Sequence, residues 1–290
     1  MNCPLNMLEL INVSKSSFFY IDCNRFTSSL TIAFDRSPLR SLMIDHTPVN
    51  DPSLTNLASN TSSTLHHLRM SCPRLSPKGI LKLANGCSYL RELSISYSVL
   101  SNELLMALSD KEHVHLEILC IEAHGEGKSL PLVSDKAWQS LAKHSPNIKI
   151  TLLCYLAEEE DYESLFLCNF PVTNLYFGNY VPASVFMKIG KSCPRLVELI
   201  VSAHGADFID QGLLSVARCC SKLRIVGLGD CKLTCSGLAE FVRLLGNSLR
   251  ELYIWEISLI DDSKCDTNEL IAKVSSLLGR TWTPEYVPLW

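Results

Sequence analysis

Apolar residues recur along the chain in one pattern, apolar-x-x-apolar-x-apolar, with mostly polar residues between them. The fullest copy is Leu223, Val226 and Leu228, followed by Cys231 and Leu233. Alternation of buried and exposed positions predicts a β-strand in each copy. Eight further copies share this core, the fifth of the nine being degenerate: Leu39/Leu42/Ile44, Leu65/Leu68/Met70, Leu90/Leu93/Ile95, Leu116/Leu119/Ile121, Ile148/Ile150/Leu152, Val172/Leu175/Phe177, Leu196/Leu199/Val201 and Leu249/Leu252/Ile254.

The copies follow one another every 24 to 27 residues, apart from one interval of 32 residues between Leu116 and Ile148. A tenth copy, Leu5/Leu8/Leu10, precedes them. This motif and pitch are those of leucine-rich repeats, in which each unit contributes a strand and a helix and stacks on its neighbours. The predicted fold is therefore an α/β leucine-rich-repeat solenoid, a horseshoe with a parallel β-sheet on its concave face and helices on its convex face.

The segments between the strands predict helices, because they are apolar on one side and begin at Ser or Asp, which cap helix N-termini. The clearest are 79–85 after Ser76, 103–108 after Ser101 and 212–218 after Asp210. A last helix over 267–278, ending at Gly279, is expected to cap the array. Residues 1–278 are thus predicted to form the repeat array with its capping helix, and residues 279–290 an aromatic and proline-rich tail.

Two segments interrupt the regular pitch. Residues 125–131 contain Gly, Ser and Pro and predict a surface insertion. The acidic run 158–161 is most simply a solvated loop, and the alternative is an electrostatic contact with a basic partner.

The composition narrows the class of protein. A net charge of −4 and a pI near 6.1 disfavour nucleic acid as a partner. We find no signal peptide and no apolar stretch of membrane-spanning length, so we expect a soluble protein of the cytoplasm and nucleus. Of the 13 cysteines, Cys87, Cys193 and Cys220 each precede a repeat's first apolar residue by three positions, which predicts buried, reduced thiols at helix ends.

Catalytic and cofactor motifs are not found in the sequence. It contains no G-x-S-x-G, no phosphate-binding glycine loop and no H-E-x-x-H. Cys219-Cys220 and the Cys231/Cys235 pair fall at repeat and turn positions and lack metal-ligand spacing. We therefore predict no catalytic residue, no cofactor, no metal and no enzymatic activity.

The strand residues between the consensus leucines should face the concave side, and this face becomes apolar from Ile118 onward. Exposed aromatic and apolar groups on a sheet favour a protein interface. The alternatives are that the tail or a loop covers them, or that the register is displaced by one residue. The candidate interface residues are Tyr176, Ile200, Ile225, Tyr253 and Trp255.

The tail carries the second group of candidate binding residues. Its prolines favour an extended chain, and its aromatic residues are unusual for a terminus and suit insertion into a partner's pocket. The alternative is that the tail packs on its own capping helix. The candidate residues are Trp282, Tyr286, Pro288, Leu289 and Trp290.

Several motifs resemble a known family. The segments Cys193-Pro-Arg-Leu196 and Gly227-Leu-Gly-Asp-Cys231 resemble the F-box/leucine-rich-repeat proteins, the substrate receptors of cullin-RING ubiquitin ligases. The segments 45–54 and 175–178 and the ending 278–290 are similar to the two receptors of that family that recruit cryptochromes. The resemblance covers essentially the whole repeat array, and the ending is its most specific part.

The resemblance implies a substrate-recognition subunit of an SCF-type ubiquitin ligase that binds cryptochromes and controls their stability in the circadian clock. It implies that the repeat wall holds the photolyase-like domain while the tail enters the flavin pocket, with Trp290 in the place of the residue that competes with flavin. The adjoining tail residues inherit only contact with the partner.

One part of the family pattern has no counterpart in the sequence, namely the F-box of approximately 40 residues that normally precedes the repeats and binds a Skp1-type adaptor and cullin. Those partners are expected only if an F-box is supplied. Two alternative functions remain open. One is an adaptor that binds the same substrate and protects it, and the other is a leucine-rich-repeat scaffold with an unrelated protein ligand.

Overall fold

The computed structural model describes residues 6–11, 39–45, 51, 54–55, 59, 61–71, 75–125, 130–166, 169–202 and 207–284. The chain divides into two compact units. The first comprises Met1–Ala123 and Leu130–Ile150, and the second His124–Ser129 and Thr151–Trp290. Two boundaries fall within the one long interval between repeats, and the third falls inside the strand Lys149–Tyr155, whose first two residues belong to the first unit. Part of the insertion predicted in that interval, residues 126–129, lies outside the described residues.

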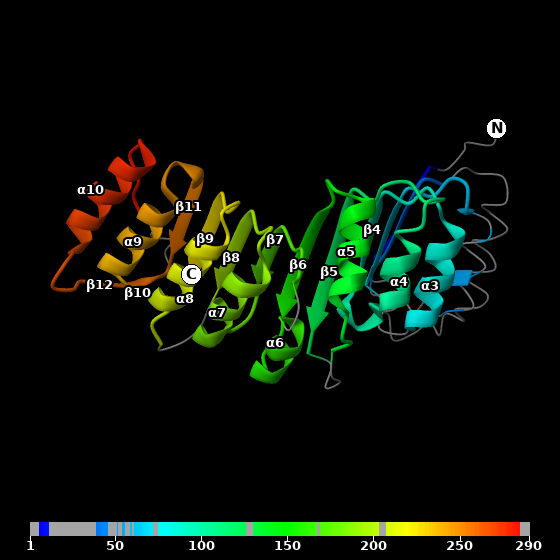
Figure 1. Ribbon diagram of the computed structural model, residues 1–290, viewed down its shortest axis with the longest axis horizontal. Coiled ribbons are helices and arrows are strands. Elements are labelled where there is room, and N and C mark those ends of the chain that lie inside the picture. The colour runs from blue at the N-terminus through cyan, green and yellow to red at the C-terminus, as the bar shows by residue number, and fades with distance from the viewer. Residues whose placement is uncertain are drawn as a thin grey trace. The chain divides into compact units, whose positions relative to one another are not determined.

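The first unit is a sheet of parallel strands covered on one face by helices (Figure 1). The strands pair in chain order, and the registers align equivalent consensus residues, as in Leu42↔Leu68↔Leu93. The elements are β1 (Met7–Ile11), β2 (Ser41–Asp45), β3 (His67–Ser71), α3 (Pro77–Gly86), β4 (Glu92–Ser96), η1 (Tyr97–Val99), α4 (Asn102–Ala107), β5 (Ile118–His124) and α5 (Asp135–His144).

The second unit repeats this layout, with its helices again on one face of a parallel sheet (Figure 1). A further two-stranded parallel sheet joins β10 and β12. The elements are β6 (Lys149–Tyr155), α6 (Glu159–Leu165), β7 (Asn174–Phe177), α7 (Ala183–Ser192), β8 (Glu198–Ser202), α8 (Asp210–Cys219), β9 (Ile225–Gly229), β10 (Lys232–Thr234), α9 (Cys235–Leu245), η2 (Gly246–Ser248), β11 (Glu251–Trp255), β12 (Ser258–Ile260) and α10 (Thr267–Leu278).

The consensus residues of the repeats form the core, as predicted. The nine first-position residues, from Leu39 to Leu249, are at most 4% exposed. The tenth copy is confirmed as a strand, because β1 pairs with β2 in the register Leu8↔Leu42 and Leu10↔Ile44. In β2 to β9 and in β11 the consensus residues of the strand are buried. The fold is therefore an α/β leucine-rich-repeat array.

The degenerate copy follows a different register from the predicted one. The pairing of β6 with β7 places Leu152 opposite Leu175 and Cys154 opposite Phe177. The sequence predicted Ile150 and Leu152 as the two consensus residues of this strand. In the pairing with β7 these two positions are held by Leu152 and Cys154. The longer strand explains the error, because Ile150, Leu152 and Cys154 are all buried.

Helix starts are predicted well with one exception. Ser76, Ser101 and Asp266 cap α3, α4 and α10, and Gly279 ends α10 in the left-handed region with φ 66°. Asp210 is not the cap of α8 but its first residue. Its carboxylate instead accepts hydrogen bonds from the backbone N–H and the hydroxyl of Thr234, the cap of α9.

This contact between successive helix starts recurs in the first unit. Asn102 Oδ1 accepts from both the N–H and the hydroxyl of Ser134, the cap of α5, each at 2.9 Å. Asp51 accepts in the same way from Ser76. At the starts of α4 and α8 a polar side chain therefore holds the cap of the next helix, which links neighbouring repeats on the helical side.

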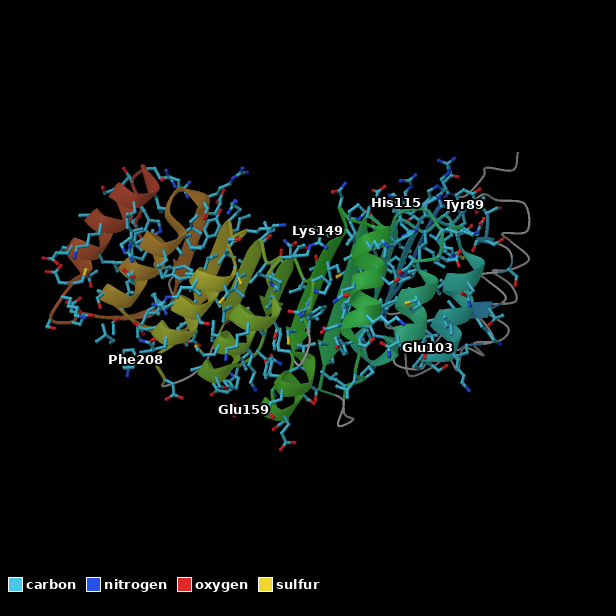
Figure 2. The ribbon with its side chains drawn as sticks, in the orientation of Figure 1. Tyr89, Glu103, His115, Lys149, Glu159 and Phe208 are labelled. Atoms are coloured by element: carbon cyan, nitrogen blue, oxygen red, sulfur yellow. The ribbon has the colours of Figure 1, made fainter. Side chains whose placement is uncertain are left out.

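The acidic run forms helix rather than the predicted loop. Glu158 is the cap of α6, and Glu159, Glu160 and Asp161 form its first turn. Negative side chains are favourable there because the N-terminal end of a helix carries a partial positive charge. Glu159 also accepts a hydrogen bond from Ser184 at the start of α7 at 2.5 Å, and its position is labelled in Figure 2.

The cysteines at helix ends are buried, as predicted. Cys87, Cys193 and Cys220 are the C-caps of α3, α7 and α8 and are 0% exposed. Burial raises the pKa of the Cys87 thiol to about 11 and that of Cys220 to about 12. In α5 the equivalent cap is Ser145, 1% exposed, whose Oγ accepts the Leu116 N–H of the preceding repeat at 2.9 Å.

None of the helices in the described part of the chain is long and apolar enough to cross a membrane.

Candidate functional site

The helix-free side of the second unit's sheet, here called the open face, carries an apolar row across five strands. The registers place Leu153, Tyr176, Ile200, Gly227 and Tyr253 side by side. Tyr253 is 42% exposed, and Tyr176 and Ile200 are half-buried. Accessible aromatic side chains among apolar neighbours are typical of protein-binding surfaces.

Two aromatic side chains lie against glycines that are in, or directly follow, the adjacent strand. A Cβ built on Gly229 would lie 2.2 Å from both Cε2 and Nε1 of Trp255, and one on Gly227 would lie 3.0 Å from its Cζ3. A Cβ on Gly178 would lie 2.6 Å from Cε1 of Tyr155. Glycine inside a strand often permits such a close approach. The glycines therefore set the position of Trp255 and Tyr155 on the open face.

Polar side chains border the apolar row on one side. Asn174 Nδ2 donates to Glu198 at 2.6 Å, and these two residues share a register with Ile225 and Glu251. The Tyr253 hydroxyl donates to Glu251. The open face thus combines aromatic groups with carboxylates whose positions are fixed by neighbours.

The five predicted sheet residues come together on this face: Tyr176, Ile200, Ile225, Tyr253 and Trp255. The sequence missed Tyr155, which is 39% exposed and stacks on His124 with ring centroids 4.9 Å apart. It was missed because no interface residue was assigned to the degenerate repeat, although strand alternation places Tyr155 on the same face as Leu153. The Gly227-Leu-Gly229 segment could have predicted that another group packs closely against this strand, because an isolated glycine within a strand often marks a close approach.

The structure corrects the role predicted for Trp282. Its side chain is 5% exposed, and its indole N–H donates to the backbone carbonyl of Leu252 at 3.0 Å. The ring therefore packs against its own unit and presents little surface to a partner. The other four predicted tail residues, Tyr286, Pro288, Leu289 and Trp290, lie outside the described residues.

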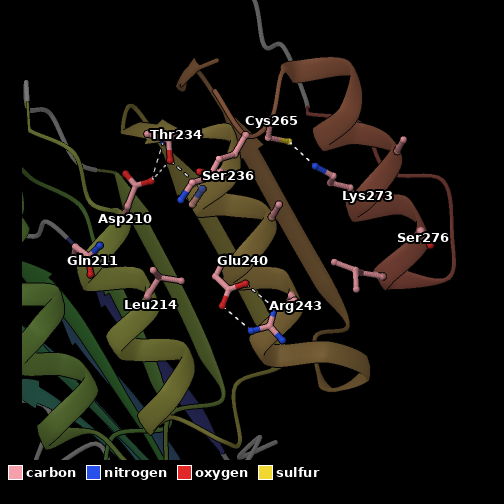
Figure 3. Close-up of a pocket in the computed structure, with 15 residues that line it drawn as sticks. Asp210, Gln211, Leu214, Thr234, Ser236, Glu240, Arg243, Cys265, Lys273 and Ser276 are labelled. Carbon is pink, nitrogen blue, oxygen red and sulfur yellow. Dashed lines mark hydrogen bonds and ion pairs between the residues drawn. The ribbon is translucent and has the colours of Figure 1, made fainter. Parts of the chain in front are cut away.

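A groove of about 840 Å³ lies on the helical side of the second unit, along α8, α9 and α10 (Figure 3). Glu240 and Arg243 on α9 form two hydrogen bonds at 2.6 and 2.7 Å. Asp210 accepts from Thr234, and its Oδ2 has no hydrogen-bond partner among the described residues. Glu240 and Arg243 thus pair with each other, and the described residues of the groove do not define a ligand.

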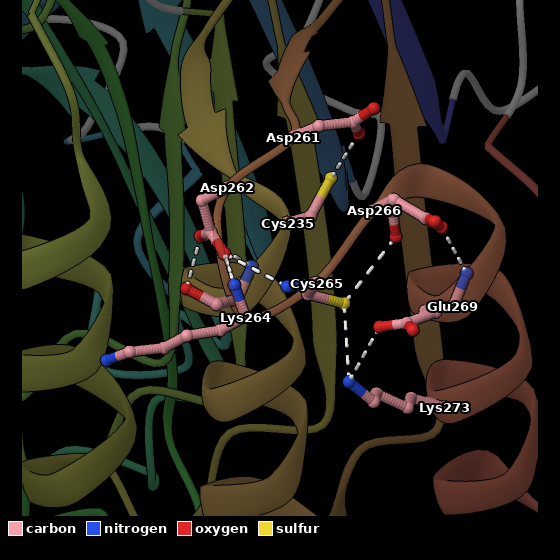
Figure 4. Close-up of polar contacts among 9 residues, drawn as sticks. Cys235, Asp261, Asp262, Lys264, Cys265, Asp266, Glu269 and Lys273 are labelled. Atoms are coloured by element: carbon pink, nitrogen blue, oxygen red, sulfur yellow. Dashed lines mark hydrogen bonds and ion pairs between the residues drawn. The ribbon is translucent and has the colours of Figure 1, made fainter.

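The polar cluster before α10 has a structural explanation (Figure 4). Asp262 accepts from the backbone N–H groups of Lys264 at 2.8 Å and Cys265 at 3.0 Å, which closes the turn, and it also accepts from Ser236 on α9. Burial raises the pKa of the Cys235 thiol to about 11, which disfavours the reactive thiolate. Within the described residues no three His, Cys, Asp or Glu side chains are grouped to hold a metal ion.

Repeated strand–helix units and an aromatic open face define a leucine-rich-repeat protein with a candidate protein-binding surface. The chain belongs to the F-box/LRR-repeat protein family. It is 42% identical over 294 residues to F-box/LRR-repeat protein 21 of sheep and of mouse, and it spans 68% of the length of each relative. The resemblance found in the sequence is thus confirmed. Of the two family members to which the sequence pointed, numbered three and twenty-one, the Pro-Leu-Trp ending favours the second, and the relatives found carry that number.

Other similarities are more distant. The chain is 24% identical over 262 residues to mouse F-box only protein 33, which covers 81% of the chain and 47% of that relative. Among solved structures it is similar to a chain of the yeast Rad7–Elc1 complex, with a TM-score of 0.47, 17% identity, and coverage of 87% of this chain and 64% of that one. No protein-family model matches the chain.

Proposed function

We propose that the chain is the substrate-reading part of an SCF-type ubiquitin-ligase receptor, and that its substrate is a cryptochrome. The observation that carries the proposal is the aromatic open face of the second unit, in a chain 42% identical to F-box/LRR-repeat proteins. The ubiquitin transfer belongs to the ligase partners, and this chain supplies recognition without chemistry of its own.

In this proposal the open face binds the photolyase-like domain and the residues after Pro284 enter its flavin pocket, with Trp290 in the place of the flavin. Burying one Trp side chain removes about 150 to 250 Å² from water, worth about 4 to 6 kcal/mol before ordering costs. Ordering one residue costs about 1 to 2 kcal/mol, so a short segment does not bind tightly alone. The sheet face must bind first and make insertion of the segment intramolecular.

The test is the affinity of the full chain for a cryptochrome photolyase-like domain, measured by calorimetry with and without added flavin adenine dinucleotide. Flavin should weaken binding of the unmodified chain. The Trp290→Ala variant should bind more weakly and lose most of its sensitivity to flavin. Equal affinities with and without flavin for the unmodified chain would contradict insertion into the flavin pocket, and no measurable binding would contradict the cryptochrome assignment.

A further inference from the structure

The segment Gly279 to Pro284, here called the C-terminal clasp, lies along β11, the last strand in the order of the sheet. The Trp282 indole N–H donates to Leu252 O at 3.0 Å, and the Arg280 guanidinium donates to Arg250 O. Strands at the edge of a sheet present unpaired backbone groups. Two side chains of the clasp therefore satisfy two backbone carbonyls at this edge.

The other side of the clasp is held by α10. Ser275 Oγ accepts a hydrogen bond from Trp282 N at 2.9 Å and donates one to Trp282 O at 3.2 Å. Trp282 and Pro284 are buried, whereas Thr281 and Thr283 are exposed. The clasp is thus bound to a helix on one side and to a strand on the other, through both its backbone and its side chains.

We infer that Trp282 and Ser275 are positioning residues, which fix the point from which residues 285–290 reach a partner. The inference rests on the proposed function, because a fixed starting point for residues 285–290 affects affinity only if those residues bind the partner. The buried indole contributes by holding the clasp to the sheet edge. Its role therefore differs from the direct partner contact predicted from the sequence.

The length of chain beyond the clasp gives the size of the effect. Six residues follow Pro284, and whatever their conformation they span at most about 20 Å at roughly 3.3 to 3.6 Å per residue. If the clasp opens, eleven residues follow Gly279 and the limit is about 38 Å. Effective concentration falls roughly as the −3/2 power of tether length, so opening the clasp lowers it about 2.5-fold. Ordering the released residues again on binding adds to this loss.

A first experiment tests the clasp without any partner. Trypsin cleaves after Arg280, and the clasp should protect this bond in the native chain. Ser275→Ala removes both hydrogen bonds to Trp282 and is expected to increase the cleavage rate about fivefold or more. Ser276→Ala, a change of the next serine on the same helix, is the matched control and should leave the rate unchanged. Equal rates in the two variants would overturn the inference.

A second experiment tests whether the clasp acts through residues 285–290. Affinity for the photolyase-like domain is measured for Ser275→Ala and for Trp282→Phe, which keeps a ring and removes the N–H. Each is made in the full chain and in a chain that ends at Pro284. In the full chain both variants should weaken binding by about 2.5-fold or more, and in the shortened chain both should have no effect.

The outcomes separate the two proposals. Equal losses in the full and the shortened chain would show that these residues do not act through the segment, and would overturn the inference. Unchanged affinity on removing residues 285–290 would overturn the binding role of the segment in the proposed function, while the trypsin experiment still judges the clasp itself.

Discussion

Replacing Gly229 by alanine tests how the open face is built. The added Cβ would lie 2.2 Å from two atoms of the Trp255 ring, so the ring must move. Gly229 is not among the described residues with positive φ, so alanine fits its backbone conformation and the clash is the main effect. Overpacking costs about 1 to 3 kcal/mol. Returning about 100 Å² of ring surface to water costs about 2.5 kcal/mol, which is consistent with that range.

The assay is urea unfolding of four chains: unmodified, Gly229→Ala, Trp255→Ala and the double variant. In the unmodified background Gly229→Ala should lower the free energy of unfolding by about 1 to 3 kcal/mol. In the Trp255→Ala background it should be neutral or stabilising by about 0.4 to 1 kcal/mol, because alanine restricts the unfolded chain. Ser202→Ala, opposite Gly229 in the register, is the control. The same loss in both backgrounds would refute the proposed contact.

Three further predictions concern the repeats. Ser145→Ala leaves the buried Leu116 N–H without its acceptor and should lower the free energy of urea unfolding by about 1 to 3 kcal/mol. Ser145→Cys, which introduces the residue type found at other helix ends, should cost less. Equal losses would contradict the equivalence of Ser145 with the cysteine caps. Tyr162→Phe removes a hydroxyl whose single proton lies between the backbone carbonyls of Leu156 and Tyr180, at 2.9 and 3.0 Å. A similar cost is expected in thermal unfolding, and an unchanged melting temperature would contradict this. The pKa of the Cys220 thiol rises from its ordinary 9.0 to about 12 on folding. Between pH 9 and 12 only the unfolded state therefore loses the proton, so the free energy of unfolding should fall as pH rises. A Cys220→Ser chain should show a smaller fall, and identical pH profiles for the two chains would contradict the assignment.

Most of the fold follows from the repeated apolar pattern, because each consensus leucine has the same buried environment in every unit. The register failed where that pattern is degenerate, at β6, since three alternating buried residues there allow two alignments. Asp210 was assigned to the wrong position because its side chain interacts with the next repeat, 24 residues along the chain. Local sequence carries no signal for such a contact.

The sheet part of the candidate site was predictable for the same reason, since strand alternation determines which residues share a face. The clasp was not. Trp282 is buried, and its indole N–H donates to a backbone carbonyl at the edge of the sheet. The sequence around it does not distinguish this buried ring from an exposed aromatic residue of a free tail. The covered glycines of β9 likewise depend on the ring of Trp255, which lies on β11, two strands later in the sequence.

The most direct test of the account is the affinity of the full chain for a cryptochrome photolyase-like domain after single substitutions on and off the open face. Tyr253 and Tyr89 have similar exposed fractions, 42% and 47%, but only Tyr253 lies on the open face. Tyr253→Ala and Trp255→Ala should each weaken binding by at least tenfold, on the order of 1.4 kcal/mol, as expected for aromatic residues central to an interface, with Tyr89→Ala unchanged. Equal affinities for all three variants and the unmodified chain would contradict the central claim that the open face is the binding surface.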